Sequence, residues 1–171
     1  MKTRSQPLFE IPRRDHVLPR SLHHGLLVVG LGLLAAALDL GTALAYWAPH
    51  GLTLGHVLRS IASWVLGPHP PNTLLVQTIG WLLHLLIYVS MAVVFDLLLG
   101  RRRYPLAQWF APGALFGLIA YVLVFRLVVP ALSYPVTLND SPSWVATCVL
   151  AHMLVIGPLL AWGLTRATPK P

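Results

Sequence analysis

Four long apolar runs, each ended by glycine, proline or charge, decide which folds this chain can adopt. A transmembrane helix needs roughly 20 apolar residues, and every run is long enough. The runs occupy residues 24–47, 73–99, 106–129 and 143–164. Only 10% of the 171 residues are charged, whereas a soluble domain has about 25%. The sequence therefore predicts an all-α protein, a four-helix transmembrane bundle that takes up residues 23–166.

The basic residues bracket these runs and predict their orientation. Of the twelve Lys and Arg, five precede the first run, three lie between the second and third, and two follow the fourth. Because cytoplasmic loops carry the excess of Lys and Arg, both termini are predicted to be cytoplasmic, with residues 1–22 as a basic arm and residues 167–171 as a tail. This pattern favours a multi-pass protein of a bacterial inner membrane, with the lipid bilayer and no nucleic acid as partner.

The first loop on the outer side carries a short amphipathic segment at residues 52–66. Its apolar residues recur with helical spacing, at Leu54, Val57, Leu58, Ile61 and Val65. At about 1.5 Å per residue, a helix here spans roughly 20 Å and is too short to cross the bilayer. We expect it either to lie in the outer interface or to be a re-entrant helix that lines a cavity.

Small residues within the runs indicate close packing of the helices. Gly113 and Gly117 form a GxxxG motif, and Gly32 and Ala36 have the same spacing; such residues let helix backbones approach one another. The single cysteine, Cys148, excludes an internal disulfide and a CxxC motif. The sequence contains no GxSxG, P-loop, GxGxxG or HExxH motif, so no class of enzyme is indicated.

Ionisable side chains interrupt all four runs. They are Asp39 in the first, His84 in the second, Arg126 in the third and His152 in the fourth. A charge near mid-membrane costs about 2.5 to 3.5 kcal/mol even on the lenient insertion scale, so these side chains should face the interior of the bundle. We predict one buried polar cluster that opens outward, made of Asp39, His84, Tyr88, Arg126 and His152, with Arg59 closing it from above.

The two aspartates within the runs are predicted to have different surroundings. Asp39 must be protonated or paired within the membrane, and Arg126 or Arg59 is the available cation. Asp96 lies near the cytoplasmic end of the second run, where residues 101–103 are all arginine. We expect Asp96 to form an interfacial pair with that triplet.

The cluster permits a functional and a structural interpretation. Histidine and aspartate are common proton carriers in membrane proteins, and the outer loop adds His50, His56 and His69. Proton-coupled or pH-responsive permeation is the function that these residues favour. Alternatively, the cluster only holds the bundle together, with His84 bonded to a neighbouring helix at about 0.6 kcal/mol per contact.

Two other functions remain open at this point. His84 and His152 lie at similar depths and are candidate axial ligands of one haem b, or metal ligands together with Asp39. The packing motifs equally suit an accessory or assembly subunit that forms a homo-oligomer or joins a larger membrane complex.

The layout resembles that of small bacterial inner-membrane proteins of the YagU-like type. The segments that carry the resemblance are WLLHLLIYVSMAVVF, APGALFGLIAYVLVF and VLAHMLVIGP, in the second, third and fourth runs. The resemblance implies a small polytopic membrane protein and a link to acid tolerance, without defining a reaction. Arg126 departs from the family pattern.

Overall fold

The computed structural model describes residues 20–100, 108–132 and 141–167, and every regular element within these ranges is a helix. Four helices in the described part are long and apolar enough to cross a membrane. They cover Leu22–His50, Leu74–Gly100, Phe110–Ala131 and Pro142–Arg166. The predicted all-α chain with four apolar helices is therefore confirmed. The predicted arm and tail lie almost wholly outside the described residues.

In the third and fourth spans a π-helical turn joins two stretches of α-helix, and the second span ends in a π-helical turn. In chain order the elements are α1 (Arg20–Trp47), η1 (Ala48–His50), α2 (Leu54–Leu66), α3 (Leu74–Phe95), η2 (Asp96–Gly100), α4 (Phe110–Tyr121), η3 (Val122–Val128), α5 (Val129–Leu132), α6 (Pro142–Ala151), η4 (His152–Ile156) and α7 (Gly157–Ala167). η1 is a 3-10 turn, whereas η2, η3 and η4 are π-helical.

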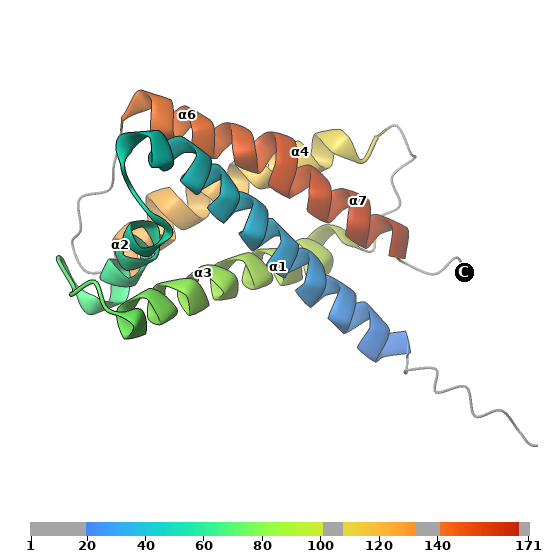
Figure 1. The fold of residues 1–171 in the computed structure, drawn as a ribbon. Coiled ribbons are helices and arrows are strands. Elements are labelled where there is room, and N and C mark those ends of the chain that lie inside the picture. Colours follow the sequence, from blue (N-terminus) through green and yellow to red (C-terminus); the bar gives the residue numbers. More distant parts are fainter. Residues whose placement is uncertain (1–19, 101–107, 133–140, 168–171) are drawn as a thin grey trace, which may run out of the picture.

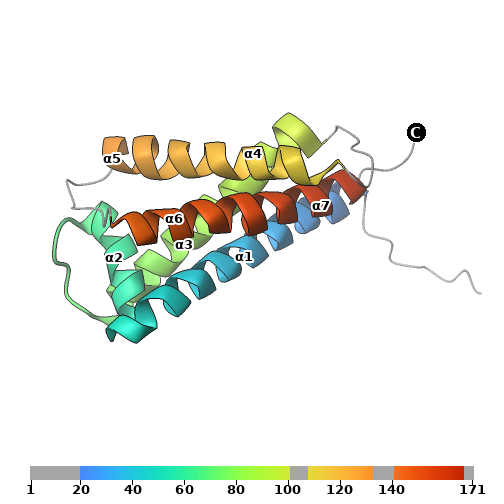
Figure 2. The same cartoon turned by 90° about the horizontal axis from the view of Figure 1, so that it is seen from above.

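The four spans run side by side, and α2 lies across one end of the bundle (Figures 1 and 2). We call this the α2 end. The start of α1 and the end of α7 lie together at the other end, which we call the terminal end. α1 packs mainly on α3, α2 packs on α3, and α4 packs on η4 and α7. Because the chain has an even number of spans, its first and last described residues lie at the same end of the bundle.

The predicted loop helix is present as α2, and its ends follow from local chemistry. Thr53 caps its N-terminus in a capping box with His56, and Gly67 ends it with a φ of 87°, which favours glycine. Leu58 and Ile61 are buried as the apolar spacing predicts, whereas Leu54 and Val65 are exposed. The buried stripe is narrower than predicted because α2 packs mainly against the single helix α3.

Prolines explain where the third span differs from its predicted bounds of 106–129. The helix begins at Phe110, after a turn at Gln108 and Trp109; an earlier start would have placed Pro112 in the helix interior, where its missing N–H and its ring are unfavourable. The helix also continues through Pro130 to Leu132 instead of stopping there. The π-helical η3 directly precedes this proline and widens the helix at the point where the ring would otherwise clash with the preceding turn.

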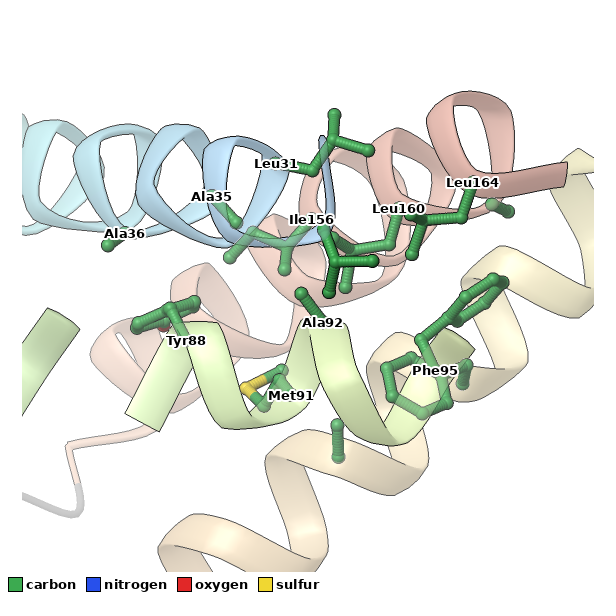
Figure 3. Packing of buried hydrophobic residues seen from close by; sticks show 14 residues of the cluster. Leu31, Ala35, Ala36, Tyr88, Met91, Ala92, Phe95, Ile156, Leu160 and Leu164 are labelled. Carbon is green, nitrogen blue, oxygen red and sulfur yellow. The ribbon is translucent and has the colours of Figure 1, made fainter. Parts of the chain in front are cut away.

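The apolar core fills the half of the bundle nearer the terminal end. Figure 3 shows side chains from α1, α3 and the fourth span meeting there, among them Leu31, Met91, Phe95, Leu160 and Leu164. Phe95 packs edge-on against another ring, Phe116 of α4, with their centroids 4.9 Å apart. Leu160 and Leu164 are fully buried. This half of the bundle is therefore closed by packed side chains.

Glycines set the distances between the spans. A Cβ on Gly117 would collide with the carbonyl of His152, and one on Gly113 would collide with Gly157 and Pro158. The predicted GxxxG motif thus packs against the fourth span of the same chain. Gly80 has the same role between α3 and α2, where it lies against the carbonyl of Leu58.

An ion pair joins two spans at the terminal end. His24 Nε2 of α1 lies 2.9 Å from Oδ2 of Asp96, at the end of the second span. Both side chains are partly exposed, so the pair contributes little to stability. The predicted partners of Asp96, the arginines at 101–103, lie outside the described residues. The structure instead shows that a histidine from another helix reaches it.

Candidate functional site

A cavity of about 400 Å³ lies between the spans at the α2 end. All four spans and α2 contribute to its walls. Its lining includes one aspartate, three histidines and one arginine: Asp39, His56, His84, His152 and Arg126. The exposed His56 and Arg126 are among them, so the cavity reaches the surface of the molecule. The four side chains predicted to meet from four different helices therefore line one space.

His84 joins α3 to α1 at the inner wall of this cavity. Its Nε2 lies 3.0 Å from the carbonyl oxygen of Ala36, and because a carbonyl only accepts, His84 carries a proton on Nε2 and donates it. The same nitrogen lies 4.0 Å from Oδ2 of Asp39. His84 is 6% exposed. The basic group beside Asp39 is thus an imidazole, where sequence reasoning expected Arg126 or Arg59.

His152 and Tyr88 form a second pair, deeper in the bundle. His152 Nδ1 lies 2.8 Å from the carbonyl oxygen of Cys148, which assigns the ring proton to Nδ1. Its Nε2 therefore accepts from the Tyr88 hydroxyl, 3.2 Å away. Both side chains are 1% exposed. The ring of Tyr88 also contacts that of His84, whose Nε2 lies 4.0 Å from the Asp39 carboxylate, so Tyr88 lies between His152 and the His84–Asp39 pair.

The π-helical turns carry two of the site residues. His152 is the first residue of η4, and Arg126 lies in η3 together with Phe125. The ring of Phe125 contacts that of His152 edge-on, with a centroid distance of 5.6 Å, and Tyr121 does the same at 5.4 Å. π-helical turns are frequent at functional sites. Each of these two turns ends two residues before a proline, Pro130 or Pro158.

Arg59 does not line this cavity. Its Nε donates to the carbonyl oxygen of Pro70 at 2.7 Å, and the side chain lies in a second, adjacent cavity. Arg59 therefore lies beside the cavity that holds Asp39, His84, Arg126 and His152, and is not among its lining residues.

Aromatic side chains form much of the remaining wall, and sequence reasoning overlooked them. Trp47, Trp64 and Trp144 line the cavity. The rings of Trp47 and Trp144 also contact that of Tyr46, whose hydroxyl lies 2.7 Å from Oγ of Ser143. Aromatic residues gather at the ends of membrane helices, which is the signal that would have indicated them.

The hydrogen bonds and ring contacts of the two histidines bear on the predictions that they bind a haem or a metal ion. Nε2 of both His84 and His152 is already hydrogen-bonded, and the Tyr88 ring contacts both imidazoles, with centroid distances of 4.8 and 6.0 Å. An iron porphyrin between the two histidines would have to displace this buried ring. Among the described residues, no three His, Cys, Asp or Glu are grouped so as to hold a metal ion. The arrangement fits a proton-exchanging or ligand-binding cavity better than an iron site.

Four helices long and apolar enough to cross a membrane, around a cavity lined by ionisable groups, indicate a multi-pass membrane protein. Comparison of the chain with protein-family models, curated proteins and solved structures found no match. The function must therefore be inferred from the residues of the cavity.

Cys148 provides a direct measure of access to this cavity. It is the only cysteine of the chain, it lines the cavity, and it is half-buried. We expect a small charged methanethiosulfonate to modify the folded protein in membranes, and a maleimide carrying a long polyethylene glycol chain to react only after unfolding. Mass spectrometry of the intact chain gives the extent of reaction, with Cys148→Ser as the unreactive control. Protection of the native thiol from both reagents would show that water does not reach the cavity.

Proposed function

We propose that this protein mediates proton-coupled or pH-responsive permeation of a small solute, with the cavity at the α2 end as the site that takes the solute up. The observation that carries the proposal is the meeting of Asp39, His84, Arg126 and His152, one from each span, around a space of about 400 Å³. Intramembrane ionisable residues of this kind mark proton relays and substrate pathways. A purely structural polar contact requires no cavity beside it.

Tyr88 gives the cluster a route for moving a proton. When His152 is neutral, its Nε2 accepts from the Tyr88 hydroxyl. A proton taken up on that nitrogen turns His152 into a donor, so the Tyr88 oxygen must then accept. The hydroxyl hydrogen must then turn away from His152, and in this proposal it turns toward the Asp39 carboxylate, which lies beside His84. Protonation of His152 thereby changes the hydrogen bonding of an aspartate on a different helix.

Passage across the membrane requires a second conformation. The core around Phe95, Leu160 and Leu164 closes the bundle toward the terminal end, so a solute in the cavity can leave that way only if the spans separate. The π-helical turns η3 and η4 are suited to absorb such a movement, because helices bend most readily at π-bulges and prolines. An alternating-access cycle, in which the cavity is open to one side at a time, follows from this arrangement.

The charge pattern gives the proposal a direction. With both termini in the cytoplasm of a bacterial cell, the cavity opens to the outer side of the inner membrane. The histidines of the loop, His50, His56 and His69, then face a compartment whose pH follows that of the surroundings. The resemblance to YagU-like proteins, with their link to acid tolerance, agrees with this direction.

Flux through reconstituted protein tests the proposal. In proteoliposomes that contain a pH-sensitive dye, we expect an imposed proton gradient to decay faster with the protein than without it. Asp39→Asn should slow this decay about ten-fold, the effect of a barrier raised by about 1.4 kcal/mol, because the amide cannot accept the proton that Tyr88 offers. Asp96→Asn is the matched control, since Asp96 pairs with His24 outside the cavity.

Two other results would replace the proposal. A wild-type protein that gives no flux but purifies with a stoichiometric larger complex would be an accessory subunit. A purified protein with a Soret band at roughly 400 to 430 nm that disappears in His84→Ala would be a haem protein. An Asp39→Asn variant with the flux of wild type would exclude Asp39 from the relay.

A further inference from the structure

A second cavity, of about 210 Å³, adjoins the first at the α2 end. It lies between α2 and the segment that joins α2 to α3. Its lining is basic and hydroxyl-bearing, and consists of His56, Arg59, Ser60, Ser63, His69 and Pro70. Every side chain in this set except the proline is able to donate a hydrogen bond. In the part of the chain that the structure describes, no carboxylate lines it.

Among the described residues, Arg59 is held in place without an acidic partner. Its Nε donates to the carbonyl oxygen of Pro70 at 2.7 Å, which fixes the half-buried guanidinium between α2 and the following segment. No ion pair joins Arg59 to an acidic group of the described chain. Arginine presents five donors in a planar fork that matches carboxylate and phosphate. The Nε bond uses one of them, and the terminal nitrogens provide the other four.

Two histidines add donors to the same cavity. Nδ1 of His56 accepts from the backbone N–H of Thr53 at 3.2 Å, so a neutral His56 carries its proton on Nε2. His69 has a φ of 59°, in the left-handed region that a histidine rarely adopts. A backbone held in this region is common at binding sites. The turn that contains it places the His69 imidazole in the wall opposite α2.

The two cavities share part of one wall. His56, Ser60 and Ser63 line both of them, so a molecule held in the second cavity lies beside the mouth of the first. The first cavity carries a further cation, Arg126. A negatively charged group would therefore meet basic side chains in both cavities.

We infer that the second cavity is a binding site for an oxyanion group, a carboxylate or a phosphate, with Arg59 as its charge partner and His56, His69 and Ser60 as further donors. Two sources supply this chemistry at a membrane surface: a small soluble anion and the headgroup of an anionic lipid. Binding at this site needs no flux, so the inference stands or falls independently of the proposed permeation.

Binding to the purified full-length protein tests the inference in two arms. The first uses inorganic phosphate and acetate at constant ionic strength, with the shift in unfolding temperature as the measure of binding. The second uses nanodiscs of phosphatidylcholine with or without phosphatidylglycerol, and native mass spectrometry to count retained lipid. We expect Arg59→Gln to weaken binding about ten-fold or more, as the loss of a charge-assisted bond implies. His69→Asn, which tolerates the left-handed backbone, should weaken it less.

Arg166→Gln is the matched control, because Arg166 lies at the terminal end over the ring of Trp162. Binding of phosphate or acetate that Arg59→Gln reduces and Arg166→Gln leaves intact supports a soluble anion. Retention of phosphatidylglycerol that Arg59→Gln reduces and Arg166→Gln leaves intact supports a lipid headgroup. If Arg59→Gln does not fold, Arg59→Lys and His69→Asn carry the comparison. Absence of binding in both arms, or equal binding by all variants, would overturn the inference.

Discussion

Replacing Gly117 by leucine is expected to prevent the bundle from closing. The hydrogen of Gly117 faces the carbonyl of His152, and a Cβ there would overlap that oxygen. The obstacle is backbone, which cannot rotate away as a side chain can, so α4 and η4 must separate. Overpacking of a close contact typically costs about 1 to 3 kcal/mol, and a whole leucine side chain at a backbone contact should reach at least the upper value. Unfolding by SDS in mixed micelles, followed by circular dichroism, measures the loss.

Gly41→Leu is the control for this substitution. Gly41 lies in the middle of a span, as Gly117 does, but a Cβ there meets no other atom within 4 Å. The two substitutions change hydrophobicity and helix propensity equally, so a difference between them reports packing alone. A Gly117→Leu protein as stable as Gly41→Leu would mean that α4 and η4 are not in contact. Because η4 begins at His152, the same comparison tests how this histidine is positioned.

The sequence predicted the spans well because the physical requirement is a simple one. A segment that crosses a membrane must satisfy its backbone groups internally and present an apolar surface, and both properties are visible in composition. Glycine spacing likewise indicated a close contact, which the structure places between Gly113, Gly117 and the fourth span. Composition does not specify which helix makes this contact, because a small residue allows the backbone of any helix to approach.

Prolines in mid-span were harder to interpret. The apolar pattern predicts that the third helix stops before Pro130, although the helix continues to Leu132. Within a bundle, a π-helical turn can absorb the missing N–H and the bulk of the ring, so proline is compatible with a continuing span. Whether a given proline ends a helix or widens it depends on what packs around it, and neighbouring sequence does not contain that information.

The sequence predicts which side chains of the candidate site face the interior of the bundle. It does not predict which groups they contact there. The cost of exposing Asp39 or His84 to lipid places both in the interior, and they do line one cavity. The partners depend on angles between helices. Asp39 therefore lies beside His84 instead of an arginine, and Arg59 turns to Pro70. A long, flexible side chain such as Arg59 reaches many acceptors from one backbone position, so its partner is the least predictable.

Removal of the His152 side chain should cost the bundle about 3 kcal/mol of unfolding free energy, in the range of large-to-alanine changes in a packed core. His152 is enclosed by the rings of Tyr121 and Phe125, and its loss leaves the buried Tyr88 hydroxyl without its acceptor. His152→Ala therefore removes packing and a hydrogen bond together. SDS titration of the purified variants measures the effect. A His152→Ala protein as stable as wild type would show that these rings do not enclose the imidazole.

Tyr88→Phe separates the two contributions, and with them the structural and functional interpretations of the site. It removes the same hydrogen bond but keeps the ring that packs against both histidines. A hydrogen bond between membrane helices contributes about 0.6 kcal/mol on average, so Tyr88→Phe should be nearly as stable as wild type. If Tyr88 relays a proton between His152 and Asp39, proton flux must nevertheless fall, because phenylalanine carries no exchangeable hydrogen. Flux that is unchanged in Tyr88→Phe would assign the Tyr88–His152 bond to packing alone, since a relay cannot operate without that hydroxyl.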